Sequence, residues 1–210
     1  MFEYEKKKRQ EGYSYVIGCD EVGRGALAGP IVAAAALFKI EDLLDIEEAW
    51  ISEVRDSKRL SQSKRIDLDK KIRNSVVNFG IGRVSNKEID KNNIHQANLS
   101  SIHQAVQEIL KISGIDVDKV LVCVDGRFAI PKLHMAQEAV IDGDDLIFSV
   151  SAASIVAKVY RDDLMMKLDK KFPEYDFGKH KGYGTQLHIK AIQKNGLSSI
   201  HRKSFCKKYV

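Results

Sequence analysis

The 210-residue sequence is poor in proline, cysteine and long apolar runs. It has only three prolines and no low-complexity linker, so we expect one domain over residues 1–210. Three cysteines occur without CxxC spacing, which excludes a disulfide framework and disfavours a zinc site; they are Cys19, Cys123 and Cys206. No apolar stretch could cross a bilayer, and the first residues lack the apolar segment of a secretory signal. These absences predict a cytoplasmic protein without membrane contact.

Basic residues slightly outnumber acidic ones. Lysine and arginine number 34 against 29 acidic residues, for a net charge of +5. This excess favours polyanionic partners only mildly, because the basic residues are spread along the chain. The most basic stretch is at the N-terminus, where residues 1–12 are expected to form a flexible, solvated arm. A contact with nucleic acid is the alternative for this stretch.

Short apolar runs alternate with amphipathic segments along the chain. Strands are expected at residues 15–20, 31–38, 79–85 and 119–125. Helices are expected at residues 61–77, from 85, at 94–112, 151–172 and 185–193, with a surface helix around Trp50. Strands that come early, with helices between and after them, predict an α/β protein with one mixed sheet flanked by helices.

Carboxylates stand at the ends of two apolar strands. Asp20 and Glu21 end one of them, Asp125 ends another, and three further acids precede a helix: Asp142, Asp144 and Asp145. A buried carboxylate needs a cation or strong donors, and all-oxygen ligands select Mg²⁺ or Mn²⁺. The alternative for the last three is a loop with a helix-capping Asp. Adjacent strand residues point to opposite faces, so Asp20 and Glu21 share a site only if the strand ends or twists there.

A glycine-flanked arginine, Gly23-Arg24-Gly25, follows the first acids directly. Glycines let the backbone approach a ligand closely, and their N–H groups can bind phosphate or sugar oxygens. Beside a metal site this segment favours a backbone clamp on a substrate. A turn with a solvated arginine is the alternative.

Taken together, these segments resemble the ribonuclease HII family, the type 2 RNases H. The matching segments run in order through the chain: DEVGRG (20–25), DSK (56–58), VDG (124–126), GD (143–144) with SAASIVAKVYRD (151–162), HKGYGT (180–185) and HRKSF (201–205). The resemblance implies an RNase H-like mixed sheet with a helical C-terminal part at about residues 173–210. It also selects Asp144, rather than Asp142 or Asp145, as the fourth acid.

The resemblance implies an endonuclease that cuts the RNA strand of RNA–DNA hybrids. It would also incise 5′ of a single ribonucleotide in duplex DNA, leaving a 3′-hydroxyl and a 5′-phosphate. Two Mg²⁺ or Mn²⁺ ions would be held by four acids: Asp20, Glu21, Asp125 and Asp144. The partners are then hybrids and ribonucleotide-containing DNA duplexes, and a monomer is expected. Docking on a sliding clamp is not expected, because the chain stops at Val210 without the long tail that docks in some members.

Substrate contacts are implied in the same way. Backbone groups of Gly23, Arg24 and Gly25 would read the 2′-hydroxyl, and Tyr183 would contact the sugar at the RNA–DNA junction. Ser57, Lys58, Arg59 and Lys181 would lie near substrate phosphates, with a solvated surface charge as the alternative for each lysine. His180 and His201 are candidates for proton transfer, with a packing role as the alternative.

Two other classes of function remain alternatives. A non-catalytic nucleic-acid-binding module needs a basic surface but no clustered acids, which repel phosphate unless a metal intervenes. A metal-dependent enzyme acting on small phosphorylated molecules would be expected to carry a phosphate-binding loop, and the sequence has none.

Overall fold

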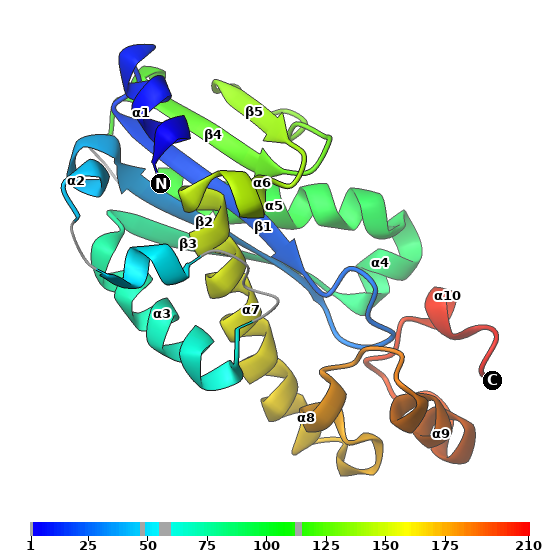
Figure 1. Cartoon of the computed structure of the whole chain (residues 1–210). Helices are drawn as coiled ribbons and strands as arrows, with labels where there is room; N and C mark the ends of the chain where they lie inside the picture. The colour runs from blue at the N-terminus through cyan, green and yellow to red at the C-terminus, as the bar shows by residue number, and fades with distance from the viewer. Residues whose placement is uncertain (1, 47–48, 55–59, 112–114) are drawn as a thin grey trace.

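Five strands form one mixed sheet within residues 2–46, 49–54, 60–111 and 115–210, which the computed structural model describes (Figure 1). The strands are β1 (Tyr15–Val22), β2 (Ile31–Lys39), β3 (Asn78–Val84), β4 (Val120–Asp125) and β5 (Gln137–Val140). Their order is β3-β2-β1-β4-β5. β1, β2 and β3 pair antiparallel, whereas β4 pairs parallel with both β1 and β5. The predicted mixed sheet is confirmed; β5 was not predicted, because its four residues lack a clear apolar pattern.

Helices cover both faces of the sheet and make up the C-terminal part. They are α1 (Glu3–Gln10), α2 (Ile40–Leu44), α3 (Gln62–Ser75), α4 (Asn86–Asn92), α5 (Ile94–Leu110), α6 (Gly143–Leu146), α7 (Phe148–Asp169), α8 (Phe177–His180), α9 (Gln186–Asn195) and α10 (Lys203–Cys206). Short 3₁₀ helices are η1 (Ala49–Glu53), η2 (Val117–Lys119) and η3 (Pro173–Tyr175). Ser61 caps α3, and Ser85 with Glu88 forms the predicted capping box of α4. Of the described helices, none is long and apolar enough to cross a bilayer.

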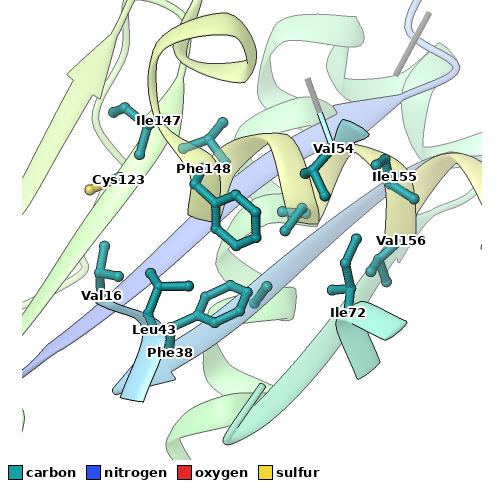
Figure 2. Close-up of a cluster of buried hydrophobic side chains, with 14 of the residues drawn as sticks. Val16, Phe38, Leu43, Val54, Ile72, Cys123, Ile147, Phe148, Ile155 and Val156 are labelled. Atoms are coloured by element: carbon teal, nitrogen blue, oxygen red, sulfur yellow. The ribbon is translucent and has the colours of Figure 1, made fainter. Parts of the chain in front are cut away.

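Helix α7 packs on one face of the sheet, over the central strands (Figure 1). The core on this face gathers Val16, Phe38 and Cys123 from the strands around Phe148 and Val156 of α7 (Figure 2). The helix approaches β1 so closely that a Cβ added at Gly18 would lie 2.0 Å from the backbone carbon of Ser149. Glycine at this position of β1 therefore sets the spacing between strand and helix.

Helix α5 packs on the opposite face. There Ile17 and Cys19 of β1 meet Ile102, Ala105 and Val106 of α5. Residues of β1 thus alternate between the α7 face and the α5 face, as the two-residue period of a strand requires. All three cysteines are buried and unpaired.

The N-terminal segment differs from the prediction. Residues Glu3–Gln10 form helix α1 rather than a flexible arm. Phe2 is buried, and its ring lies edge-on to Phe148 with 5.1 Å between centroids. The Lys8 ammonium lies 2.6 Å from a carboxylate oxygen of Glu138 in β5. Charged residues that indicated a solvated tail therefore join the first helix to the sheet.

The prediction of a surface helix around Trp50, within residues 41–55, also needs correction. The described part of this segment holds the short helix α2 and the 3₁₀ helix η1 rather than one surface helix. Trp50 is only 4% exposed, and its ring centroid lies 6.3 Å from that of Phe148. Its indole therefore belongs to the core on the α7 face.

The C-terminal part is helical, as expected, and it packs on the chain that follows β1. Leu27 contributes to a small core with Ile192 and Cys206, and Ala28 to another with Phe177. Isolated β-bridges join Ala26 to Tyr183 and Ala28 to His201. The end of the chain thus supports the loop that leaves the central strand.

Candidate active site

A cavity of about 530 Å³ opens where β1 and β4 end. Its lining residues are Asp20, Glu21, Val22, Gly23, Arg24, Gly25, Arg65, Asp125, Asp144, Ser154, Lys158 and Tyr183. The structure therefore brings together the four predicted acids, the glycine-flanked arginine and the predicted junction tyrosine. Ser57 and Lys58, with Arg59, lie outside the described residues.

Lys181 does not line this cavity. Its ammonium donates to the carbonyl oxygen of Gly178 and lies 3.5 Å from the sulfur of Met166. A phosphate contact by Lys181 would require this side chain to leave these partners.

Parallel pairing places Asp20 beside Asp125. Cys19 is the register partner of Val124, so the next residue of each strand stands at the same end of the sheet. One oxygen of Asp20 accepts a hydrogen bond from the Glu21 backbone N–H at 2.7 Å. The Asp125 carboxylate accepts one from the Gly143 N–H at 2.8 Å, which fixes α6, and hence Asp144, next to β4.

Asp20 and Glu21 point to opposite faces of β1 yet line one cavity. The Asp20 carboxylate is hydrogen-bonded by Ser154 of α7, on one face. The Glu21 carboxylate is hydrogen-bonded by Asn98 of α5, on the other face. Both reach the cavity because it lies across the end of the strand. The two acids thus line one cavity although both lie within β1, which ends one residue later at Val22.

The surroundings of the site disfavour the ionised form of its own carboxyl groups. Burial raises the pKa of the Asp20 carboxyl well above its usual range, and the charges of Glu21 and Asp125 raise it further. Burial also raises the pKa of Glu21, although Arg24 and the hydrogen bond from Asn98 partly offset this effect. The Arg24 guanidinium lies 3.5 Å from the Glu21 carboxylate. Crowded, buried carboxylates of this kind are stabilised when cations join them.

The donor chemistry fits hard divalent cations. Asp20, Glu21, Asp125 and Asp144 offer only carboxylate oxygens, the ligands of Mg²⁺ and Mn²⁺. Among the described residues, no three Asp, Glu, His or Cys side chains already converge as they do in a closed metal site. The four acids instead surround a shared cavity, where they could hold ions together with water and substrate oxygens.

A buried arginine holds the backbone beside Gly23-Arg24-Gly25. Arg161 of α7 is fully buried, and its guanidinium donates to the carbonyls of Ala28, Pro30 and Lys181 at 3.3, 3.1 and 2.9 Å. Gly23 has φ +89°, and a Cβ there would lie 2.1 Å from the Arg161 Nε. Glycine at this position is therefore needed for both the turn and the arginine beneath it.

A second buried arginine acts from the C-terminal part. Arg202 donates to the Gly29 carbonyl at 3.0 Å and to the Arg24 carbonyl at 2.9 Å. No carboxylate of the described residues forms an ion pair with Arg161 or Arg202. Burial, followed by the charge of Arg161, lowers the pKa of Arg202 to about 9. Both cations thus organise a loop of carbonyl groups instead of neutralising acids.

Tyr183 lines the cavity and lies beside Arg161. Its ring centroid is 5.3 Å from the Arg161 guanidinium and 5.9 Å from the Lys158 ammonium. Its carbonyl oxygen lies 3.0 Å from Nδ1 of His188. Cationic side chains and a buried histidine therefore fix the orientation of the predicted junction residue.

The predicted histidines lie behind the cavity rather than in it. His180 stacks on His188 at 4.3 Å, and Nε2 of His188 is 3.0 Å from Nε2 of His201. Burial lowers the pKa of all three, to about 4 for His188 and His201. Neutral rings in a buried network correspond to the packing alternative for His180 and His201.

Sequence reasoning assigned no role to several residues of the site. They are Arg65, Asn98, Ser154, Lys158, Arg161 and Arg202. Ser154, Lys158 and Arg161 follow one another at intervals of four and three residues, which places them on one face of α7. This spacing could have been recognised in the sequence as one polar face of a helix. Asn98 gave none, because a polar residue in an amphipathic helix usually faces solvent.

A family model described as Ribonuclease HII matches residues 17–208 of the chain. The chain belongs to the ribonuclease HII family. It is 41% identical over 204 residues to the ribonuclease HII of Clostridioides difficile strain 630, covering 97% of this chain and 74% of that protein. As a member of the ribonuclease HII family it is a nuclease, and the family implies endoribonuclease action on the RNA of RNA–DNA hybrids.

Solved structures agree with the ribonuclease HII assignment. The crystal structure of ribonuclease H2 from Pyrococcus horikoshii OT3 superposes with a TM-score of 0.71 at 26% identity, over 93% of this chain and 96% of that one. Bst-RNase HIII in complex with Mn²⁺ gives a TM-score of 0.70 at 19% identity, over 96% of this chain and 71% of that one. The second likeness shows the shared fold alone.

Proposed function

We propose that this ribonuclease HII family member hydrolyses the RNA strand of hybrids and incises 5′ of single ribonucleotides in duplex DNA, using two divalent cations. The observation that carries the proposal is the meeting of four acids from β1, β4 and α6 with the Gly23–Gly25 backbone in one cavity. The acids supply the metal chemistry, and the backbone supplies close contact with a sugar. The acids alone, or the Gly23–Gly25 backbone alone, would be compatible with a wider range of functions.

Asp20, Glu21, Asp125 and Asp144 are the residues that would hold the cations, Mg²⁺ or Mn²⁺. Two bound cations would supply an activated water and stabilise the departing 3′ oxygen. Ser154 and Asn98 orient Asp20 and Glu21 by hydrogen bonding from opposite faces. Lys158 lines the same cavity and could meet substrate phosphate, although its ammonium is 2.8 Å from Asp162.

Selection of a ribonucleotide rests on the loop held by the buried arginines. Arg202 binds the carbonyl of Arg24, so the N–H of Gly25, in the same peptide unit, is fixed in orientation. A preset N–H group can recognise the 2′-hydroxyl, which is the group that distinguishes RNA from DNA. Tyr183 would then pack on the sugar that follows. This division separates chemistry, carried by the acids, from recognition, carried by the loop and the tyrosine.

The direct test is cleavage of an RNA–DNA hybrid with Mg²⁺, with and without EDTA. Asp144→Asn keeps the shape of a cavity-lining acid that is 8% exposed, and Asp145→Asn changes its exposed neighbour. We expect Asp144→Asn to lose activity by orders of magnitude, while Asp145→Asn cleaves like the wild type. Cleavage that persists in EDTA, or equal activity of both variants, would contradict the proposed metal site.

Ribonucleotide recognition has its own test. Tyr183→Ala removes a ring that is worth ~1–3 kcal/mol if it stacks as aromatic side chains do on nucleic acid. We expect incision at a single embedded ribonucleotide to fall more than cleavage within a long hybrid, where many ribonucleotides offer alternative registers. Both substrates are measured with one enzyme preparation. An equal loss on both would mean that Tyr183 serves the fold or general binding.

The two alternatives give different results in the same assays. A non-catalytic binding module would bind the hybrid and leave it intact in Mg²⁺. An enzyme for small phosphorylated molecules would neither cleave the hybrid nor respond to Tyr183→Ala on nucleic-acid substrates.

A further inference from the structure

A small recess adjoins the candidate active site on the α5 side of β4. Its volume is about 30 Å³, and Arg24 and Asp125 line both the recess and the main cavity. Its remaining walls come from α5 and from the loop after β4, and include His95, Asn98, Arg127 and Phe128. The recess therefore lies next to the cavity that would hold the scissile phosphate.

The ring of Phe128 lies at the rim of this recess. The side chain is 55% exposed, and it is the one phenylalanine or tryptophan among the large apolar residues that are exposed in the described part of the chain. The His95 ring meets it edge-on, with 4.6 Å between centroids at 70°. This contact holds the Phe128 ring beside α5, while more than half of the residue stays open to solvent.

The loop that carries Phe128 is pinned on both sides. Before it, the Gly126 N–H donates to the Val140 carbonyl at 2.9 Å. After it, the Gln137 amide accepts from the Ile130 N–H at 2.7 Å and donates to the Ile130 carbonyl at 3.1 Å. An exposed aromatic on a fixed loop loses little conformational entropy when a ligand stacks on it.

Polar groups beside the ring suit a nucleotide. Arg127 is exposed, and its guanidinium forms no ion pair or hydrogen bond with the described residues. Asn98 is 7% exposed, and its side-chain oxygen is buried without a hydrogen-bond partner among them. A recess of this size holds one hydroxyl or water, and the Asn98 oxygen could accept a hydrogen bond from such a group.

We propose that Phe128, Arg127 and the recess form a second nucleotide subsite, in which a sugar–base unit of the substrate stacks on Phe128 and its phosphate meets Arg127. The subsite rests on the proposed function, because its ligand is a nucleotide next to the one at the metal site. An aromatic face beside a free cation is the combination that binds nucleic-acid strands. The subsite would add a contact with the duplex beyond the scissile nucleotide.

The experiment measures binding and cleavage separately. Labelled duplexes with one ribonucleotide are titrated in EDTA, which prevents turnover, and kcat and KM are then measured in Mg²⁺. We expect Phe128→Ala to weaken binding and raise KM about tenfold or more, with kcat close to wild type. Phe128→Trp should restore affinity, whereas Phe128→Leu should not. Arg127→Ala should lower the salt dependence of binding by about one phosphate contact.

A matched control removes another exposed apolar side chain. Val117 is 47% exposed and lies before β4, at the end of the sheet away from the site, so Val117→Ala should bind like the wild type. Shortening the duplex by single nucleotides, first on one side and then on the other, should reach a length at which wild-type affinity drops to that of Phe128→Ala.

The outcomes separate this subsite from the proposed function. If the wild type cleaves and Phe128→Ala binds and cleaves like it, the subsite is overturned and the function stands. If the wild type does not cleave but Phe128→Ala still binds the duplex more weakly, the subsite stands and the function fails. Equal weakening by Phe128→Leu and Phe128→Ala, with recovery in Phe128→Trp, supports stacking, whereas full recovery by Phe128→Leu overturns it.

Discussion

Replacement of Gly23 or Gly25 by alanine should impair the protein for a different reason in each case. A Cβ added at Gly25 meets no atom of the described residues within 4 Å, apart from its two chain neighbours, and its φ lies outside the left-handed region. Gly25 lines the main cavity, so the new methyl group would occupy space that the substrate needs. A Cβ added at Gly23 would instead meet Arg161, at 2.1 Å from its Nε.

The structure gives a magnitude for each change. Gly25→Ala should alter stability by no more than about 0.5 kcal/mol, since nothing in the folded chain must move. Gly23→Ala combines the left-handed φ, at about 1–2 kcal/mol, with displacement of an Arg161 that donates three hydrogen bonds. A total of ~3 kcal/mol or more is expected, which lowers the Tm by roughly 6–12 °C in a protein of this size.

The assay pairs thermal unfolding with incision of a duplex that contains one ribonucleotide. Gly25→Ala should melt within about 2 °C of the wild type yet lose incision by roughly 5- to 150-fold, the equivalent of ~1–3 kcal/mol of overpacking against substrate. Gly23→Ala should lose both. Wild-type incision by Gly25→Ala would refute close backbone approach at this position, and a large fall in its Tm would refute the reading of open space around it.

Two further predictions concern solution conditions. His188 and His201 have a folded-state pKa of about 4, below the usual 6.5, so the unfolded chain takes up protons first as the pH falls. The stability that this network contributes should be complete above about pH 6.5 and be lost towards pH 4. Tm measured across this pH window should fall less steeply in His188→Gln than in the wild type. An equal slope in both proteins would count against the lowered histidine pKa values. Substrate affinity should decrease with salt at a log–log slope of about −0.9 for each phosphate neutralised, and a flat response in an equilibrium binding assay would show that phosphate contacts do not dominate.

Residue patterns along the chain were sufficient to predict most of the fold. Apolar runs that end on Asp20 and Asp125 indicated buried strands whose ends would meet, and parallel pairing of β1 with β4 has this result. The Ser85 and Glu88 spacing predicted a capping box that the structure contains. These features depend on interactions between neighbours in sequence, or on one strongly apolar period, and so a single sequence reveals them.

Other features depended on contacts that no local pattern encodes. The charged first helix was interpreted as a solvated arm because Lys8 finds its partner, Glu138, 130 residues away. Arg161 and Arg202 were missed for a related reason. A buried arginine whose hydrogen bonds go only to backbone carbonyls has no acidic partner, so no acid in the sequence indicates that it is buried. Asn98 likewise gains its role from α5 lying beside the end of β1, a tertiary arrangement.

The reach of Arg202 has a consequence for how the molecule matures. Its guanidinium donates to the carbonyl of Arg24, 178 residues earlier in the chain, so the loop after β1 gains this support only once residue 202 has left the ribosome. The strands that carry Asp20 and Asp125 can pair well before that moment. A nascent chain that ends before residue 202 could thus bring the acids together while the loop proposed to select ribonucleotides lacks this hydrogen bond. The order of translation therefore lets the acids meet before the loop proposed to select ribonucleotides is held by Arg202.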